Sequence, residues 1–90
     1  MSTTPTETTG PDARIGELRA EIDACDDQLI ELVRRRLSIS QEIGSIRTSS
    51  GGMRLNLARE REVLARFRRA LGPDGAALGM MLLRQGRGPL

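Results

Sequence analysis

Charged residues interrupt two apolar stripes that recur at helical spacing. Alternating steps of four and three residues, the repeat of one helix face, connect nine positions in the first stripe, and eight of them are apolar. These positions are Leu18, Ile22, Cys25, Leu29, Leu32, Arg36, Ile39, Ile43 and Ile46. The second stripe consists of Leu57, Glu60, Leu64, Phe67 and Leu71. Arg36 and Glu60 therefore occupy positions that would otherwise pack against a neighbouring helix, and they are the first candidates for chemistry.

Two further arginines lie near these charges. Arg47 follows Arg36 by three helical turns plus about 20°, so the two project from nearly the same face, about 16 Å apart. Arg59 directly precedes Glu60. A buried Arg36–Glu60 pair that fixes helix register would explain both interruptions, but such pairs add little net stability. The additional arginines over-neutralise one carboxylate, and this surplus positive charge favours a site for a bound anion.

The residue types limit what such a site can catalyse. The chain has no His, and all 14 basic residues are Arg, so Glu60 is the main candidate for acid–base or covalent chemistry. The single Cys25 lies on the apolar stripe, where a buried inert thiol is expected. A Cys/His metal cluster is excluded, and SGGMRL lacks the spacing and the lysine of a phosphate-binding loop.

Electrostatic and conformational catalysis remains. A site of this kind holds a dianion in a reactive shape and stabilises charge as it develops. A pericyclic rearrangement of a dicarboxylate needs only that, so neither a metal nor a cofactor is expected.

Composition and charge indicate a small soluble protein. The 90 residues are 38% hydrophobic and 29% charged, with one Phe and no Trp or Tyr. Residues 1–32 carry a net charge of −6 and residues 33–90 a net charge of +8, so the basic part suits a small polyanion or a nucleic acid. The lack of aromatic stacking platforms and the acidic first part argue against nucleic acid. Nothing resembles a signal peptide or a membrane span, so a cytoplasmic location is expected.

The breaks in the pattern predict an all-α fold of three helices, one long and two short. Residues 1–11 are rich in Thr, Pro and Gly and are expected to be a disordered tail; residues 12–90 are expected to form one domain. Pro11 and Asp12 favour a helix start, which predicts a helix over about 12–48. SSGGM at 49–53 is a flexible break. Further helices are predicted over about 56–71 and 74–85, separated by Gly72-Pro73-Asp74.

The length of the first helix predicts a homodimer. Its apolar stripe extends from Ile15 to Ile46, about 47 Å. Helices of about 16 and 12 residues are too short to cover that stripe. We therefore expect the long helix to pack against its counterpart in a second copy of the chain.

The assembled motifs resemble a known family. LRAEIDACDDQLIELVRRRLSISQEIGSIR, then SGGMRLNLARERE and LGPDGAALGMMLLRQGRG, are similar to the all-α chorismate mutases of the AroQ type, particularly the short actinobacterial subclass. The resemblance covers about residues 15–88. It implies rearrangement of chorismate to prephenate, on the route to phenylalanine and tyrosine, by an intertwined three-helix homodimer with two active sites and no cofactor.

The resemblance also implies roles for individual residues. Arg36 and Arg59 of one chain would bind the substrate carboxylates, and Arg19 of the other chain would complete the clamp. Arg47 would donate to the ether oxygen as the C–O bond breaks, and Glu60 would hold the substrate hydroxyl.

The resemblance also implies that Met53 and Asn56 line the pocket. Two positions, Asn56 and Gln85, depart from the better-known enteric relatives. Asn56 stands where those relatives have aspartate. They also have a glutamine late in the third helix, for which Gln85 is the available substitute here. The site therefore resembles an incomplete version of the enteric one, and a low activity of the free protein is expected.

The actinobacterial subclass suggests a partner. Its members form a complex with DAHP synthase that raises their activity, and RQGRGPL at 84–90 and the loop at 49–55 would be the contact points. Within the fold, a 4-amino-4-deoxychorismate mutase or an isochorismate-pyruvate lyase remains an alternative. A non-catalytic dimer that regulates DAHP synthase is the alternative from another class.

Overall fold

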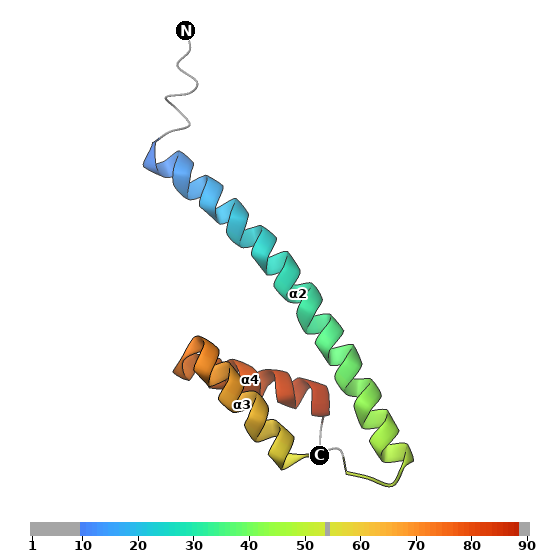
Figure 1. Cartoon of the computed structure of the whole chain (residues 1–90). Coiled ribbons are helices and arrows are strands. Elements are labelled where there is room, and N and C mark those ends of the chain that lie inside the picture. The colour runs from blue at the N-terminus through green and yellow to red at the C-terminus, as the bar shows by residue number, and fades with distance from the viewer. Residues whose placement is uncertain (1–9, 54, 89–90) are drawn as a thin grey trace. The chain divides into compact units, whose positions relative to one another are not determined.

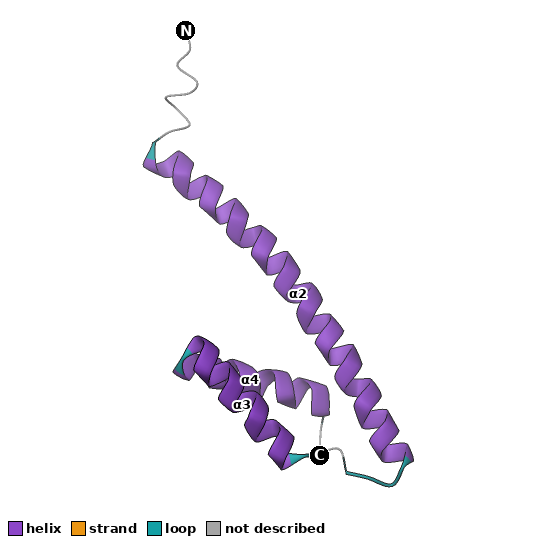
Figure 2. Ribbon diagram, in the orientation of Figure 1, coloured by secondary structure: helices purple, strands orange, loops and turns teal. Residues whose placement is uncertain are grey.

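The structure, a computed structural model, describes residues 10–53 and 55–88. These residues form three helices and no strand (Figure 2). The helices are α2 (Pro11–Ser49), α3 (Leu57–Leu71) and α4 (Pro73–Arg87) (Figure 1). The prediction of an all-α fold with one long and two short helices is confirmed, and every helix end lies within two residues of its predicted position. Residues 1–9, which hold most of the predicted tail, lie outside the described residues.

Helix α2 is 39 residues long, which corresponds to about 58 Å. Pro11 occupies its first position, where the missing N–H of proline is no loss, and Asp12 places a negative charge in the first turn. The helix ends where Ser50 Oγ donates to the Ile46 carbonyl (2.8 Å) and the Gly52 N–H donates to the Arg47 carbonyl (2.7 Å). These bonds satisfy carbonyls that the last turn leaves without helical partners.

Helices α3 and α4 form a hairpin around Gly72. This residue is both the C-cap of α3 and the N-cap of α4, and its N–H donates to the Arg68 carbonyl (2.8 Å). Its φ of 83° lies in the region that only glycine adopts without strain. Pro73 then begins α4 directly, so the connection between the two helices is a single residue.

Small residues allow the two helices of the hairpin to lie close together. A Cβ placed on Gly75 would stand 2.3 Å from the Phe67 carbonyl oxygen. One turn later, a Cβ on Gly79 would be 3.3 Å from a methyl carbon of Leu64. Val63, at 6% exposure, is the buried hydrophobic side chain among the described residues. The hairpin therefore has a narrow contact and little core of its own.

The contacts within the chain divide it into two units, Met1–Leu32 and Val33–Leu90. Residues 10–32 consist of Gly10 and the first part of α2, whose large apolar side chains are 40–60% exposed. These are Ile15, Leu18, Ile22, Leu29, Ile30 and Leu32. Cys25 is exposed as well, so the expectation that this thiol is buried is wrong for the single chain as the described residues 10–53 and 55–88 show it. A single domain over residues 12–90 stays a prediction.

The second unit contains the last part of α2 together with α3 and α4. The apolar stripe of α2 is exposed in this unit too: the side chains on it are 48–60% exposed at Ile39, Ile43 and Ile46. Across residues 10–53 and 55–88, none of the helices combines the length and the apolar character that crossing a bilayer requires.

Candidate active site

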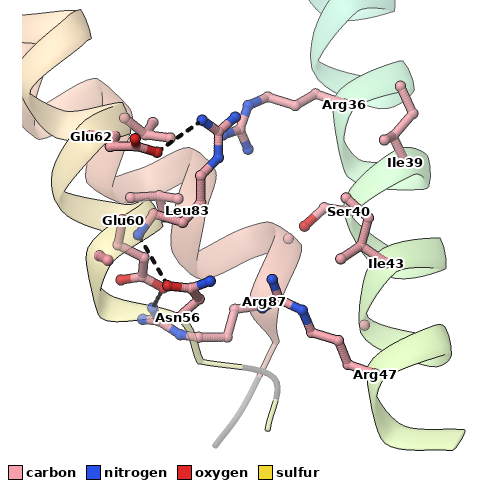
Figure 3. Close-up of a pocket in the computed structure, with 15 residues that line it drawn as sticks. Arg36, Ile39, Ser40, Ile43, Arg47, Asn56, Glu60, Glu62, Leu83 and Arg87 are labelled. Carbon is pink, nitrogen blue, oxygen red and sulfur yellow. Dashed lines mark hydrogen bonds and ion pairs between the residues drawn. The ribbon is translucent and has the colours of Figure 1, made fainter. Parts of the chain in front are cut away.

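A cleft of about 510 Å³ lies within the second unit, between α2 and the ends of α3 and α4 (Figure 3). Its size is typical of a site for a small ligand. Charged, polar and apolar residues all contribute to its lining. The lining residues are Arg36, Ile39, Ser40, Ile43, Gly44, Arg47, Asn56, Ala58, Arg59, Glu60, Glu62, Val63, Leu83, Gly86 and Arg87.

Helix α2 contributes two arginines to one wall of the cleft. Arg36 and Arg47 both line it, and both extend from α2 toward the other two helices (Figure 3). Arg36 Nη1 donates to the backbone carbonyl of Leu82 in α4 (3.3 Å). That bond uses one of five guanidinium donors, so Arg36 keeps further donors for a ligand.

The end of α4 approaches this wall at Gly86. A Cβ placed there would stand 2.3 Å from Ser40 Oγ and 2.7 Å from Ser40 Cβ. Gly86 is buried, and only the absence of its side chain allows the two helices to approach so closely. The approach brings Leu83, Gly86 and Arg87 into the lining of the cleft.

Glu60, in the first turn of α3, forms an ion pair with Arg87, in the last turn of α4. Arg87 Nη1 donates to Glu60 Oε2, and each side chain is 15% exposed. The interpretation of a register-fixing Arg36–Glu60 pair is therefore wrong: Arg36 bonds to a backbone carbonyl, and Glu60 has another arginine as its partner. Arg87 did not emerge from the sequence as a site residue. The glycines on both sides of it, Gly86 and Gly88, were the available signal of a close approach.

Two more of the predicted site residues, Asn56 and Arg59, line the cleft at the start of α3. Asn56 is the N-cap, and its Oδ1 accepts a hydrogen bond from the Arg59 backbone N–H (3.1 Å). The Arg59 side chain is 62% exposed and pairs with Glu62 at 3.4 Å. Ion pairs this exposed contribute little to stability, so the Arg59 guanidinium is easily redirected toward a ligand.

Three residues considered from the sequence lie outside the cleft lining that the structure describes. Met53 is 75% exposed and lines a neighbouring hollow that shares Arg47 and Asn56 with the cleft. Gln85 is exposed on α4. Arg19 is exposed in the first unit, and its predicted role depends on a second chain.

The charge of the cleft suits an anion. Four arginines and two glutamates line it, a formal charge of +2. The described residues hold no grouping of three or more His, Cys, Asp or Glu that could bind a metal ion. Positive charge, apolar surface and one part-buried carboxylate together can bind and orient a small dianion that also carries a hydroxyl group.

A family model named chorismate mutase type II matches residues 18–81. The chain belongs to the type II chorismate mutase family. The match includes α3 and most of α2 and α4. Arg87, which lines the cleft, lies beyond the matched residues.

Individual relatives of this family agree with that assignment. An intracellular chorismate mutase of Mycolicibacterium smegmatis is 49% identical over 76 residues, which are 84% of this chain and 73% of the relative. The intracellular chorismate mutase of Mycobacterium tuberculosis is 48% identical over 80 residues, or 89% and 75% of the two chains.

A solved structure is similar in fold. It is the non-covalent complex of DAHP synthase and chorismate mutase from Corynebacterium glutamicum with a bound transition state analog. The matching chain gives a TM-score of 0.85 at 47% identity, over 88% of this chain and 95% of that one.

Proposed function

We propose that this protein is a chorismate mutase, which converts chorismate to prephenate. The observation that carries the proposal is the cleft with a formal charge of +2, because chorismate carries two carboxylates. Membership of the family and two relatives named chorismate mutase support the same reaction.

The reaction needs no external reactant. In one pericyclic step the ether C–O bond breaks while a C–C bond forms within the same molecule, so atoms and electrons balance. The protein has to hold chorismate in a compact conformation in which the bond-forming carbons lie close together. It also has to stabilise the negative charge that grows on the ether oxygen.

Residues of the cleft can be assigned to these tasks. Arg36 and Arg59 would bind the two carboxylates, since guanidinium groups match carboxylates in two-pronged geometry. Arg47 would donate to the ether oxygen at the moment when charge develops there. Glu60 would accept a hydrogen bond from the substrate hydroxyl, and Asn56 would line the pocket at the start of α3. These assignments follow the family resemblance, and the cleft brings the five residues together.

We further propose an intertwined homodimer in which α2 packs along α2 of a second copy. The exposed apolar stripe of α2, which runs from Ile15 to Ile46 at 40–60% exposure, supports this arrangement. Arg19 of the second copy would then complete each carboxylate clamp. Burial of the stripe would also cover Cys25.

DAHP synthase is the proposed protein partner, because the similar chain from Corynebacterium glutamicum forms a complex with that enzyme. The end of the chain from Arg84 and the loop at 49–55 are the proposed contact points. Arg54, Pro89 and Leu90 of these segments lie outside the described residues. Both named relatives are intracellular proteins, which supports the predicted cytoplasmic location.

The deciding experiment follows chorismate absorbance and prephenate formation with the protein alone and with the DAHP synthase of Corynebacterium glutamicum. We expect turnover that increases when the synthase is present. Parallel reactions with 4-amino-4-deoxychorismate and isochorismate identify the two alternatives within the fold. Binding to the synthase without turnover of any substrate would indicate the non-catalytic regulatory dimer and overturn the proposal.

A further inference from the structure

Glu60 is held by one arginine on one of its two carboxylate oxygens. Arg87 Nη1 donates to Oε2, whereas Oε1 has no hydrogen bond from the described residues. Both side chains line the cleft and are 15% exposed. Figure 3 shows Arg87 reaching from the end of α4 to Glu60 at the start of α3. Oε1 is thus the carboxylate oxygen that is left to accept a hydrogen bond from a hydroxyl group.

Stability does not account for this pair. A part-buried ion pair loses to desolvation much of what it gains from attraction. In addition, Arg87 Nε is buried and has no hydrogen-bond partner in the part of the chain that the structure describes. A buried donor without a partner is unfavourable. An arrangement with these costs at the wall of an anion cleft suggests a functional reason for it.

The backbone around Arg87 keeps its side chain in this place. Gly86 lies against Ser40 with no room for a Cβ. The Gly88 N–H caps the end of α4 by donating a hydrogen bond to the Arg84 carbonyl (3.0 Å). The residue between the two glycines therefore projects from a fixed position. A glutamate side chain has several rotamers of similar energy, and a second charge from another helix selects one of them.

We propose that Arg87 is a positioning residue that orients Glu60 so that Oε1 faces the substrate hydroxyl. The proposal rests on the chorismate mutase function proposed above. It adds a residue of α4 that acts on the reaction through Glu60. Orientation of this kind lowers the barrier because the acceptor is already in place when the substrate adopts its reactive shape.

The main test is a double-mutant cycle between Arg87 and Glu60, measured as kcat and KM on the full chain with DAHP synthase present. Arg87→Met removes the charge and keeps much of the stem. We expect it to lower kcat on the order of 10- to 100-fold, the range found on removal of residues that orient metal-binding side chains through a hydrogen bond, with a smaller change in KM. In the Glu60→Gln background the same substitution should have almost no further effect. Additive losses would overturn the proposal.

Two variants separate orientation from general effects of charge. Arg87→Lys keeps a donor that reaches the same carboxylate, so it should recover part of the lost kcat. Arg66→Met removes an exposed arginine of α3 that lines neither the cleft nor the proposed contact with DAHP synthase, and it should leave kcat and KM unchanged. A higher kcat in Arg87→Met would mean that the pair blocks Glu60 instead of orienting it, and a loss in Arg66→Met equal to that in Arg87→Met would indicate only a charge effect. Either result would overturn the proposal.

A spectroscopic measurement decides the pairing without any turnover. The Arg87 Nε–H is buried and the guanidinium is held by Glu60, so its signal in a ¹⁵N–¹H spectrum should exchange slowly with water. Glu60→Gln should speed that exchange, and an unchanged signal would overturn the proposal. If the unaltered protein converts no chorismate with or without DAHP synthase, the proposed function fails, and this measurement still decides whether Arg87 holds Glu60.

Discussion

Gly86 of α4 lies so close to Ser40 of α2 that a Cβ on Gly86 would stand 2.3 Å from Ser40 Oγ. This close approach brings the end of α4, with Arg87, against the helix that carries Arg36 and Arg47. The contact between two small residues therefore determines the width of the cleft.

Gly86→Ala tests this packing. The added methyl group has to displace α4 or Ser40, which should lower the free energy of unfolding by about 1–3 kcal/mol and reduce kcat/KM. Thermal unfolding and chorismate kinetics measure the two effects. Adding Ser40→Gly to this variant removes the obstructing atoms and should restore part of the activity.

Gly16→Ala is the matched control for helix propensity. A Cβ on Gly16 meets nothing within 4 Å, and alanine is favoured over glycine inside a helix by about 0.5–1 kcal/mol. This control should be slightly stabilised and fully active. Unchanged stability and activity in Gly86→Ala would contradict the packing described for α2 and α4.

Arg36→Ala should abolish most of the activity. The loss of a largely desolvated contact to a carboxylate costs about 2–5 kcal/mol, measured as the fall in kcat/KM for chorismate. Arg35→Ala removes a neighbouring arginine that is exposed and should retain activity. Near-native turnover by Arg36→Ala would show that the carboxylate is bound elsewhere.

Asn56 has a structural role that can be separated from its place in the cleft. Its side chain caps α3 by accepting from the Arg59 N–H, so Asn56→Ala should cost about 0.5–2 kcal/mol in urea unfolding. Asn56→Asp keeps the acceptor and adds a negative charge that is favourable at a helix N-terminus. We expect the aspartate variant to be as stable as the unaltered protein. Equal stability of Asn56→Ala would mean that the cap contributes nothing in solution.

Arg19 can be tested by complementation between two inactive chains. In a mixed dimer of Arg19→Ala and Arg36→Ala chains, one site lacks both arginines and the other keeps both. Refolding an equal mixture should therefore restore about a quarter of the wild-type activity by random pairing of chains. Each variant alone serves as the control. A mixture as inactive as its components would show that Arg19 acts within its own chain, and full activity of Arg19→Ala alone would show that Arg19 has no role in the site.

The helices could be predicted from the sequence because their ends are local. Pro11 with Asp12 begins α2, the glycines at 51 and 52 follow its end, and Gly72 with Pro73 separates α3 from α4. Each signal depends on the backbone preferences of one or two residues. The eleven-residue spacing of Arg36 and Arg47 placed both on one face for the same reason, since a single helix determines that relationship.

Contacts between residues of different helices could not be predicted from the periodicity of the sequence. Glu60 was matched with Arg36 from the pattern, whereas its partner Arg87 is 27 residues away on another helix. Met53 follows two glycines in a loop whose path no repeat determines, and it lies in the neighbouring hollow. The exposure of Cys25 shows the same limit, because a stripe indicates that a face needs cover and does not indicate which chain provides it.

The single-residue connection at Gly72 makes helix length a determinant of the site. Helices α3 and α4 each contain 15 residues counted from this turn, so the first turn of one returns to the level of the last turn of the other. An insertion or deletion of one residue between Glu60 and Gly72, or between Gly72 and Arg87, would rotate one side chain by about 100° and shift it by about 1.5 Å. The segment from Glu60 to Arg87 can therefore tolerate substitutions more readily than changes in its length.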